Sequence, residues 1–412
     1  MLLLICFLSV KISFFITIYC KLFFDLGSIA KERLVNNPTL FLFLTPICFW
    51  ISAYMCRKFS FYAAGNSMEY IKSSIAILQK NPNDFKQISP FLNFKVVFVK
   101  AISSLICCFG GGSLGAEGPA VHMSAGIFAS TANKLQNYLY KLKYEIWIFA
   151  GSAAGIALAF NAPIAGFVYA IEKLSHLRSK SFKSDLFWTL ITLLIVSAIL
   201  QKTNAVFATP KPNFEVGSHI LLFIFMALFC GILAFLFKSL NSYFFNKIAN
   251  IKSNWWHLFP ILGGFLVALI GLYSGIYSFS SGVQTVNYAL ENQGALLSYK
   301  EVIGRILNTI ISFVSGCAGG LIAPSIAIGA GIGSIFGTFM TSVDINLFII
   351  VGMTAFLSAI LGEPIAAAII IFEATRQPIN SIPFLLLGSF LALFSLKNCD
   401  RLRNNLAKPK KL

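Results

Sequence analysis

The chain has 412 residues, of which 57% are hydrophobic and only 11% are charged. Soluble domains contain about 25% charged and about 45–50% apolar residues, so this composition excludes a soluble enzyme and a disordered chain. The apolar runs are continuous and do not alternate with polar residues, which favours lipid-facing helices over a β-barrel. We therefore expect an all-α polytopic membrane protein in a lipid bilayer.

The chain carries 32 Lys and Arg against 15 Asp and Glu, a formal net charge of +17. Such an excess is typical of nucleic-acid binding, or of the cytoplasmic loops that orient membrane helices. The basic residues lie between apolar runs and in the segment 397–412, so the second interpretation is preferred. We expect no nucleic-acid partner, a basic cytoplasmic tail at 397–412, and a field that attracts anions.

The segment 1–24 is predicted to be the first membrane helix. No basic residues precede its apolar run and no small-residue cleavage site follows, which disfavours a secretory signal. Further apolar stretches lie at 40–55, 96–109, 146–170, 186–200, 220–237, 258–279, 306–340, 347–372 and 384–396. Some are near the roughly 20 residues that span a bilayer, but others are much longer and are interrupted by Gly and Pro. This pattern predicts broken helices that enter the membrane part-way.

The chain also repeats itself. The segment 151–166 resembles the segment 352–367, and each contains Pro-Ile-Ala followed by a Glu at the same spacing. A Gly-Pro pair at 118–119 and an Ala-Pro pair at 323–324 repeat in the same order. Duplicated halves of membrane proteins usually pack as inverted repeats with the substrate between them. We expect one transmembrane domain over 1–412, with approximate repeats at 1–200 and 201–396.

The sharpest local motif is the glycine-rich segment 110–122, which places Glu117 at membrane depth. An ionisable residue there is costly and is a functional-site candidate by default. Gly115, Gly118 and Pro119 indicate the start of a helix, whose N–H groups and positive dipole end attract an anion. An anion site and a helix-capping glutamate at an interface explain this motif about equally well.

Two weaker motifs accompany the first. In the segment 316–325, glycines again precede Ala-Pro and an apolar helix, so the N–H groups of Leu321 and Ile322 could face the same anion. A tight crossing of small residues is the alternative. In the polar turn 64–69, the amide of Asn66 could donate to an anion, although a plain surface loop explains the turn almost as well.

Together, four segments resemble the signature sequences of the CLC family of anion channels and anion/proton exchangers. They are GAEGP at 115–119, FNAPIAG followed by Glu172 at 160–172, GGLIAP at 319–324 and EPIAAAIIIFE at 363–373. Lys100 also matches a family lysine on the preceding helix. The resemblance extends from about residue 22 to residue 396, and the combination is far more specific than any segment alone. It implies two inverted repeats of tilted, broken helices, and a homodimer with one pore in each subunit.

The resemblance also implies roles for individual residues. Glu117 is then the gate: its ionised carboxylate occupies the anion path, and protonation or displacement lets an anion pass. Residues expected to bind the anion, largely through main-chain N–H groups, are Asn66, Ser67, Ala116, Gly118, Leu321 and Ile322. Glu172 is a possible member of a proton path. Structural positions of the motifs are Gly115, Pro119, Asn161, Pro163 and Pro324.

Three departures from the family pattern bear on mechanism. The family's GSGIP loop reads GNSME at 65–69, so Asn66 stands where a coordinating serine is usual, and a shift by one residue would bring in Ser67. Where exchangers often carry an inner proton-handling glutamate, this chain has Lys173, which puts proton coupling in question. No tyrosine follows Tyr299, so the family's pore tyrosine is missing and the inner gate must be built differently.

We therefore expect transport of a small inorganic anion, with chloride first and with channel or anion/proton exchanger left open. Fluoride export is the alternative, because fluoride-specific relatives replace the coordinating serine, with Asn among the substitutes, although GGLIAP resembles the ordinary motif. A carrier of organic acids fits the motifs poorly. The expected location is a prokaryotic plasma membrane.

A membrane enzyme that uses its buried glutamates as acids and bases is a further alternative. No nucleophile–base pair accompanies them, and nine cysteines and four histidines show no metal-ligand spacing. We expect neither enzymatic activity nor a metal or other cofactor. Glu172 and Glu373 are expected to cap helices or to pair within their repeat.

Overall fold

The structure is a computed structural model that describes residues 2–81, 84–135, 144–174, 206–212, 219–251, 254–291, 296–339 and 344–406. These residues are mostly helical and contain no strand, which confirms the all-α prediction. The first half contains α1 (Leu2–Asn36), α2 (Phe41–Phe59), α3 (Ser67–Lys80), α4 (Phe85–Ile88), α5 (Phe94–Phe109), α6 (Glu117–Lys134), α7 (Tyr144–Phe160) and α8 (Pro163–Leu174). The second half contains α10 (Ile220–Ala249), α11 (Leu258–Ser274), α12 (Val283–Glu291), α13 (Tyr299–Val314), α14 (Ile322–Gly337), α15 (Ile345–Leu361), α16 (Pro364–Ala374) and α17 (Ile382–Leu406).

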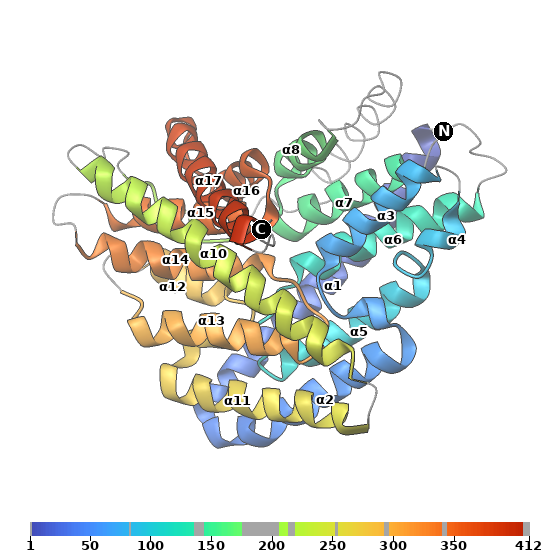
Figure 1. The fold of residues 1–412 in the computed structure, drawn as a ribbon, viewed down its shortest axis with the longest axis horizontal. Coiled ribbons are helices and arrows are strands. Elements are labelled where there is room, and N and C mark those ends of the chain that lie inside the picture. The colour runs from blue at the N-terminus through green and yellow to red at the C-terminus, as the bar shows by residue number, and fades with distance from the viewer. Residues whose placement is uncertain are drawn as a thin grey trace, which may run out of the picture.

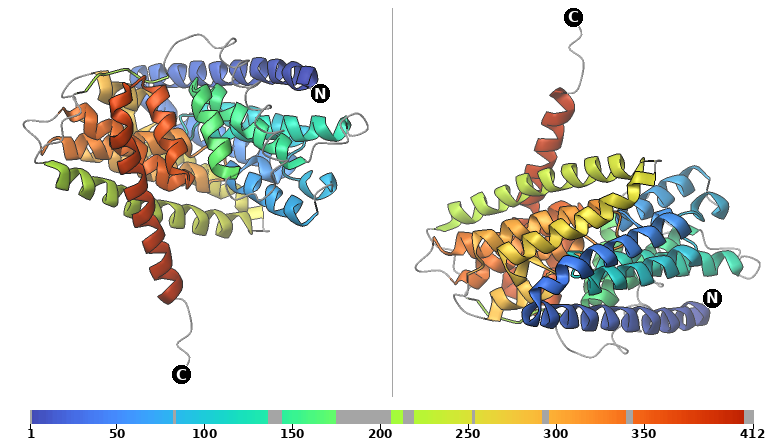
Figure 2. Two further views of the ribbon diagram at one scale, coloured as in Figure 1. Left: turned by 90° about the horizontal axis from the view of Figure 1, so that it is seen from above. Right: turned by 90° about the horizontal axis from the view of Figure 1, so that it is seen from below.

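The longest apolar helices lie on the outside of the molecule. Five helical segments of the described chain are long and apolar enough to cross a membrane, and they include α1, α2, α10, α11 and α17. Figure 2 shows α1 and α10 along opposite faces of the fold. Their outward side chains are large and apolar, for example Phe14 at 70% and Leu221 at 76% exposed. An apolar surface of this extent is stable against lipid but not against water.

Two tightly packed helix pairs, α6 with α7 and α14 with α15, form the interior. Every residue of α7 is buried. Glycines allow the backbones to approach: a Cβ at Gly151 would lie 2.7 Å from Ala125 Cα, and one at Gly333 would lie 2.6 Å from Ile349 Cα. Such small-residue contacts are how helices pack where lipid supplies no hydrophobic driving force.

The two halves end their central helices in the same way. The chain leaves α7 through Asn161, whose φ is 49°, and leaves α15 through Gly362, whose φ is 82°. Both are left-handed conformations, which Gly adopts freely and Asn more readily than most residues. Asn161 therefore makes the turn after which α8 begins at Pro163. Gly362 makes the same turn before α16 begins at Pro364, and this shared turn explains why the Pro-Ile-Ala pattern occurs twice in the sequence.

The short helices α8 and α16 lie side by side (Figure 1) and cap each other. The carboxylate of Glu172 accepts from the N–H groups of Ile365 and Ala366, at 3.1 and 2.7 Å. The carboxylate of Glu373 accepts in the same way from the N–H groups of residues 164 and 165, at 3.2 and 2.6 Å. The two glutamates were expected to cap or pair within their own repeat. They do cap helices, but each caps the helix of the opposite half.

Several predicted boundaries differ in the structure. The first helix continues past residue 24 to Asn36, because polar residues at its end interrupt the apolar pattern without breaking the helix. The long stretches 146–170, 306–340 and 347–372 are each divided into two helices at Gly, Asn or Pro, as expected. The predicted tail from 397 onward continues α17 as far as Leu406. The stretch 186–200 and residues 407–412 lie outside the described residues.

Candidate functional site

Two glycine loops from opposite halves pair at the centre of the molecule. The N–H of Gly115 donates to the carbonyl of Gly320, and the N–H of Gly320 donates to the carbonyl of Gly115, both at 2.8 Å. A Cβ at Gly118 would lie 2.6 Å from Gly320 Cα, so the backbones meet where only glycine fits. This pairing brings the N-terminal ends of α6 and α14 together.

The two helix starts present main-chain donors that have no acceptor within their own helix. The first N–H groups of a helix are left unpaired by its hydrogen-bond pattern and carry a partial positive charge. Pro119 and Pro324 have no N–H. The remaining first-turn donors are those of Glu117, Gly118, Ile322 and Ala323. Ala116 and Leu321, both predicted to bind the anion, are the N-cap residues. Such a cluster can hold a dehydrated anion without a full positive charge beside it.

The Glu117 carboxylate lies among these helix starts. It is fully buried, and neither oxygen has a hydrogen-bond partner of ordinary geometry. It packs over Gly115, where any Cβ would collide with its Oε2 and would lie 2.9 Å from the Cβ of Ala323. A buried carboxylate without hydrogen bonds is costly, so mainly the positive ends of the helices stabilise its charge here. The charge of this carboxylate is thus stabilised by the same two helix starts that can hold an anion.

The polar turn before α3 gives its asparagine and its serine different contacts. Asn66 is the N-cap of α3: its Oδ1 accepts from Met68 N at 3.1 Å, and its Nδ2 donates to Glu69 Oε1 at 3.2 Å. Ser67 is 3% exposed, and its Oγ has no hydrogen-bond partner among the residues that the structure describes. A Cβ at Gly118 would lie 3.6 Å from this Oγ, so the hydroxyl borders the start of α6.

A small cavity of about 60 Å³, which we call the Ser67 cavity, opens between these elements. Predicted site residues that line it are Asn66, Ser67, Gly118, Leu321 and Ile322. Its volume suits one small ion with a few water molecules. Sequence reasoning missed other lining residues, among them Lys72, Lys238, Phe313 and Ile360. Of these, Lys238 carried a signal, because it is an ionisable residue within the long apolar helix α10.

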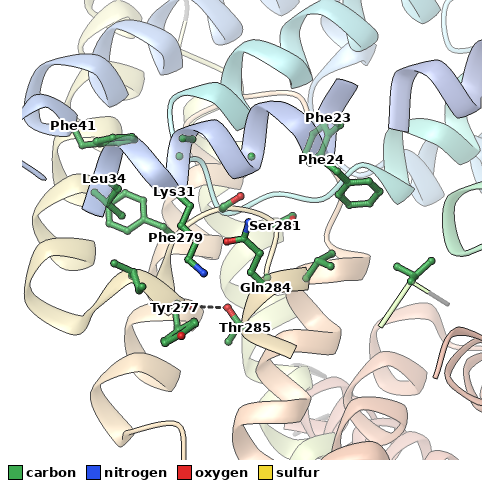
Figure 3. Close-up of a pocket in the computed structure, with 18 residues that line it drawn as sticks. Phe23, Phe24, Lys31, Leu34, Phe41, Tyr277, Phe279, Ser281, Gln284 and Thr285 are labelled. Carbon is green, nitrogen blue, oxygen red and sulfur yellow. Dashed lines mark hydrogen bonds between the residues drawn. The ribbon is translucent and has the colours of Figure 1, made fainter. Parts of the chain in front are cut away.

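A second cavity, of about 290 Å³, lies between α1 and the segment leading into α12 (Figure 3). Lys31 points into it together with Gln284, and Thr285 Oγ1 donates to the Tyr277 carbonyl at 2.8 Å. None of the predicted site residues lines this cavity. Its greater size therefore does not make it part of the Glu117 site.

Two further lysines were singled out by the sequence. Lys173 forms an ion pair with Glu363, the residue before α16, and both side chains are mostly buried. The position where exchangers often carry a proton-handling glutamate therefore holds a neutralised cation. Lys100 is fully buried on α5, and its ammonium has no hydrogen-bond partner. In the described part of the chain, no three His, Cys, Asp or Glu side chains gather as a metal site.

Comparison with known sequences gives one family. The family described as voltage gated chloride channel matches residues 48–396. The chloride channel protein CLC-e of Arabidopsis thaliana is 28% identical over 324 residues, which are 70% of this chain and 45% of the relative. The H(+)/Cl(-) exchange transporter ClcA of Vibrio parahaemolyticus is 24% identical over 82% of this chain and 72% of its own. The chain thus spans less than half the length of the plant relative.

Solved structures share the fold. A slow cyanobacterial Cl-/H+ antiporter superposes with a TM-score of 0.77 at 18% identity, over 100% of this chain and 99% of its own. A CLC-type fluoride/proton antiporter superposes with a TM-score of 0.77 at 20% identity, over 96% of this chain and 95% of its own. At such identities the likeness shows a common architecture, including its inverted repeats of broken helices.

Proposed function

Because this chain belongs to the voltage-gated chloride channel (CLC) family of integral membrane proteins, we propose that it carries chloride across a membrane through a path controlled by Glu117. The path lies within each subunit of a homodimer. Exchange transporters of bacteria among the relatives support a prokaryotic plasma membrane as the location.

The observation that carries the proposal is that the paired glycine loops bring the starts of α6 and α14 together around one buried carboxylate, with the Ser67 hydroxyl bordering the start of α6. The anion enters the Ser67 cavity, where the Ser67 hydroxyl and the N–H groups of Gly118 and Ile322 replace part of its hydration shell. The Glu117 carboxylate competes for the positive ends of α6 and α14. Protonation of Glu117, or its displacement by the incoming anion, removes that competition and opens the path.

Fluoride export is the second candidate. It is supported by the asparagine at position 66 and by the shared fold with a fluoride/proton antiporter. We favour chloride, because the Asn66 side chain is engaged in capping α3 while the hydroxyl of Ser67 is free of partners.

The proposal is tested by ion flux from liposomes that contain the purified protein. We expect chloride efflux well above that of empty liposomes, and a slower efflux of fluoride. The variant Glu117→Gln, a permanently neutral gate, should have altered chloride flux and no proton flux coupled to it. The matched control is Glu291→Gln, an exposed glutamate at the end of α12, which should behave like the wild type. A strong preference for fluoride, or proton-coupled flux that survives Glu117→Gln, would reject the assignment.

A further inference from the structure

A lysine interrupts the apolar helix α10 next to the Ser67 cavity. Lys238 follows an almost wholly apolar run from Ile220 to Phe237 and is only partly exposed. Within the described part of the chain, no hydrogen bond or ion pair within 4 Å engages its ammonium. A cation on a membrane helix is costly and usually faces a cavity, where it takes part in ion pathways. Because no carboxylate of the described residues lies within 4 Å of the ammonium, its donors are available to a ligand.

Lys238 stands in the wall between two cavities. On one side is the Ser67 cavity, with the unpartnered Ser67 hydroxyl and the start of α14. On the other side is a wider cavity of about 400 Å³ between α10 and α17, which Asp400 and Arg403 also line. Lys238 is the residue common to the two linings, so its side chain borders both cavities.

The charges around Lys238 favour an anion. The charged residues that line the Ser67 cavity are two lysines, Lys72 and Lys238, and one carboxylate, Glu69. The Glu69 carboxylate already accepts a hydrogen bond from Asn66. Asp400 and Glu363 also act on the Lys238 ammonium. Each of these is itself paired: Asp400 with Arg403 at 2.8 Å, and Glu363 with Lys173. Since a cleft lined mainly by one sign of charge concentrates ions of the opposite sign, the cavity attracts small anions.

We propose that Lys238 is an anion-binding side chain that receives small inorganic anions from the cavity between α10 and α17 and holds them at the entrance of the Ser67 cavity. The inference rests on the proposed anion path and adds to it a ligand that carries a full charge. Binding places the anion between the Lys238 ammonium and the Ser67 hydroxyl, before it reaches the helix starts beside Glu117. The lysine therefore sets how tightly anions bind at this end of the path.

The test compares three variants on the same helix. Lys238→Met removes the charge but keeps an apolar side chain of similar length, and Lys238→Arg keeps the charge. Lys247→Met is the matched control, because Lys247 is exposed near the end of α10 and lies outside both cavities. Folding is checked for each by size-exclusion chromatography and thermal unfolding in detergent.

Chloride binding to the purified proteins is measured by calorimetric titration, and flux is measured separately in liposomes. We expect Lys238→Met to weaken chloride binding about tenfold, with a similar rise in the chloride concentration for half-maximal flux. Lys238→Arg should retain most of the affinity, and Lys247→Met should match the wild type.

Three results would overturn the inference: unchanged binding in Lys238→Met, an equal loss in Lys247→Met, or no chloride binding by the wild type. Failure of the proposed function has a different signature. It would be a wild type that binds chloride in a Lys238-dependent manner but gives no flux above that of empty liposomes.

Discussion

At the scale of single residues, the two polar side chains of the turn before α3 have separate tasks. Asn66 caps the helix through its Oδ1, while the neighbouring Ser67 has a buried hydroxyl without a partner. An unpaired buried hydroxyl is unfavourable, and an anion that accepts a hydrogen bond from it removes that cost. The turn thus keeps a buried hydroxyl donor one residue after the position where the family's serine is usual.

Because the two side chains have different tasks, alanine substitutions at the two positions should affect different quantities: chloride binding in one case and stability in the other. Ser67→Ala should weaken chloride binding about tenfold, since a hydrogen bond to a charged group is lost, with little change in stability. Asn66→Ala should lower the free energy of unfolding by about 1 kcal/mol, the usual cost of an N-cap, and leave binding nearly unchanged. Titration calorimetry and thermal unfolding measure the two effects. A larger loss of affinity in Asn66→Ala would reverse the assignment.

The contact between Gly118 and Gly320 predicts a steric effect. Gly118→Ala places a methyl group 2.6 Å from Gly320 Cα, so the paired loops must separate. We expect loss of chloride flux and a decrease in stability of about 1–3 kcal/mol, the usual range for overpacking.

A control for this substitution is Gly362→Ala, where nothing lies within 4 Å of the added Cβ. Its φ of 82° makes alanine strained by about 1–2 kcal/mol, but the site is untouched, so flux should persist. Wild-type flux in Gly118→Ala would show that the close approach of the two loops is not required for transport.

At the scale of elements, α8 and α16 are linked by reciprocal caps. A carboxylate at a helix N-terminus satisfies unpaired N–H groups and interacts favourably with the helix dipole. Because Glu172 and Glu373 occupy equivalent positions in the two halves, their contributions should be similar. The capping contacts give Glu172 a structural role in addition to the proton path expected from the sequence.

Whether the two capping carboxylates contribute equally to stability can be tested with Glu172→Gln and Glu373→Gln. Each should lower the free energy of unfolding by about 1–2 kcal/mol, measured by thermal unfolding, with Glu291→Gln as the neutral control. If capping is the only role of Glu172, both variants will show the same proton flux as the wild type. A selective loss of proton flux in Glu172→Gln would instead support the proton path.

At the scale of the whole molecule, the ion pair of Lys173 with Glu363 bears on coupling between ions. The pair links α8 of one half to the start of α16 of the other half, and it occupies the position where exchangers often carry a titratable glutamate. A lysine at this position offers no carboxylate that could take up and release a proton during transport, and Glu363 balances its charge. The molecule is therefore expected to move anions with weak proton coupling.

This expectation predicts the reversal potential of the reconstituted protein. Under separate chloride and proton gradients, the reversal potential should follow the chloride gradient and should change little when the pH gradient is altered. The physical reason is that no proton-handling group stands at position 173. A reversal potential that shifts in fixed proportion with the proton gradient would establish tight exchange and would contradict the prediction.

Features that depend on local chemistry can be predicted from the amino-acid sequence. Continuous apolar runs indicate membrane helices, Gly and Pro mark where those helices break, and the recurring Pro-Ile-Ala segments reveal two halves. The ambiguity at Glu117, either an anion site or an interfacial cap, could not be resolved in this way. Both interpretations need only a carboxylate near a helix start.

Contacts between groups that are distant in the sequence become visible in the folded chain alone. Three features join residues about 170 to 210 positions apart: the pairing of Gly115 with Gly320, the exchange of caps between α8 and α16, and the lining of one cavity by both Lys238 and Ser67. Local sequence does not encode such contacts, because they depend on how two inverted halves pack against each other. The polar turn before α3 illustrates the difference: sequence matching offered Asn66 and, by a shift of one residue, Ser67, whereas the structure makes Asn66 the cap of α3 and leaves the Ser67 hydroxyl next to α6.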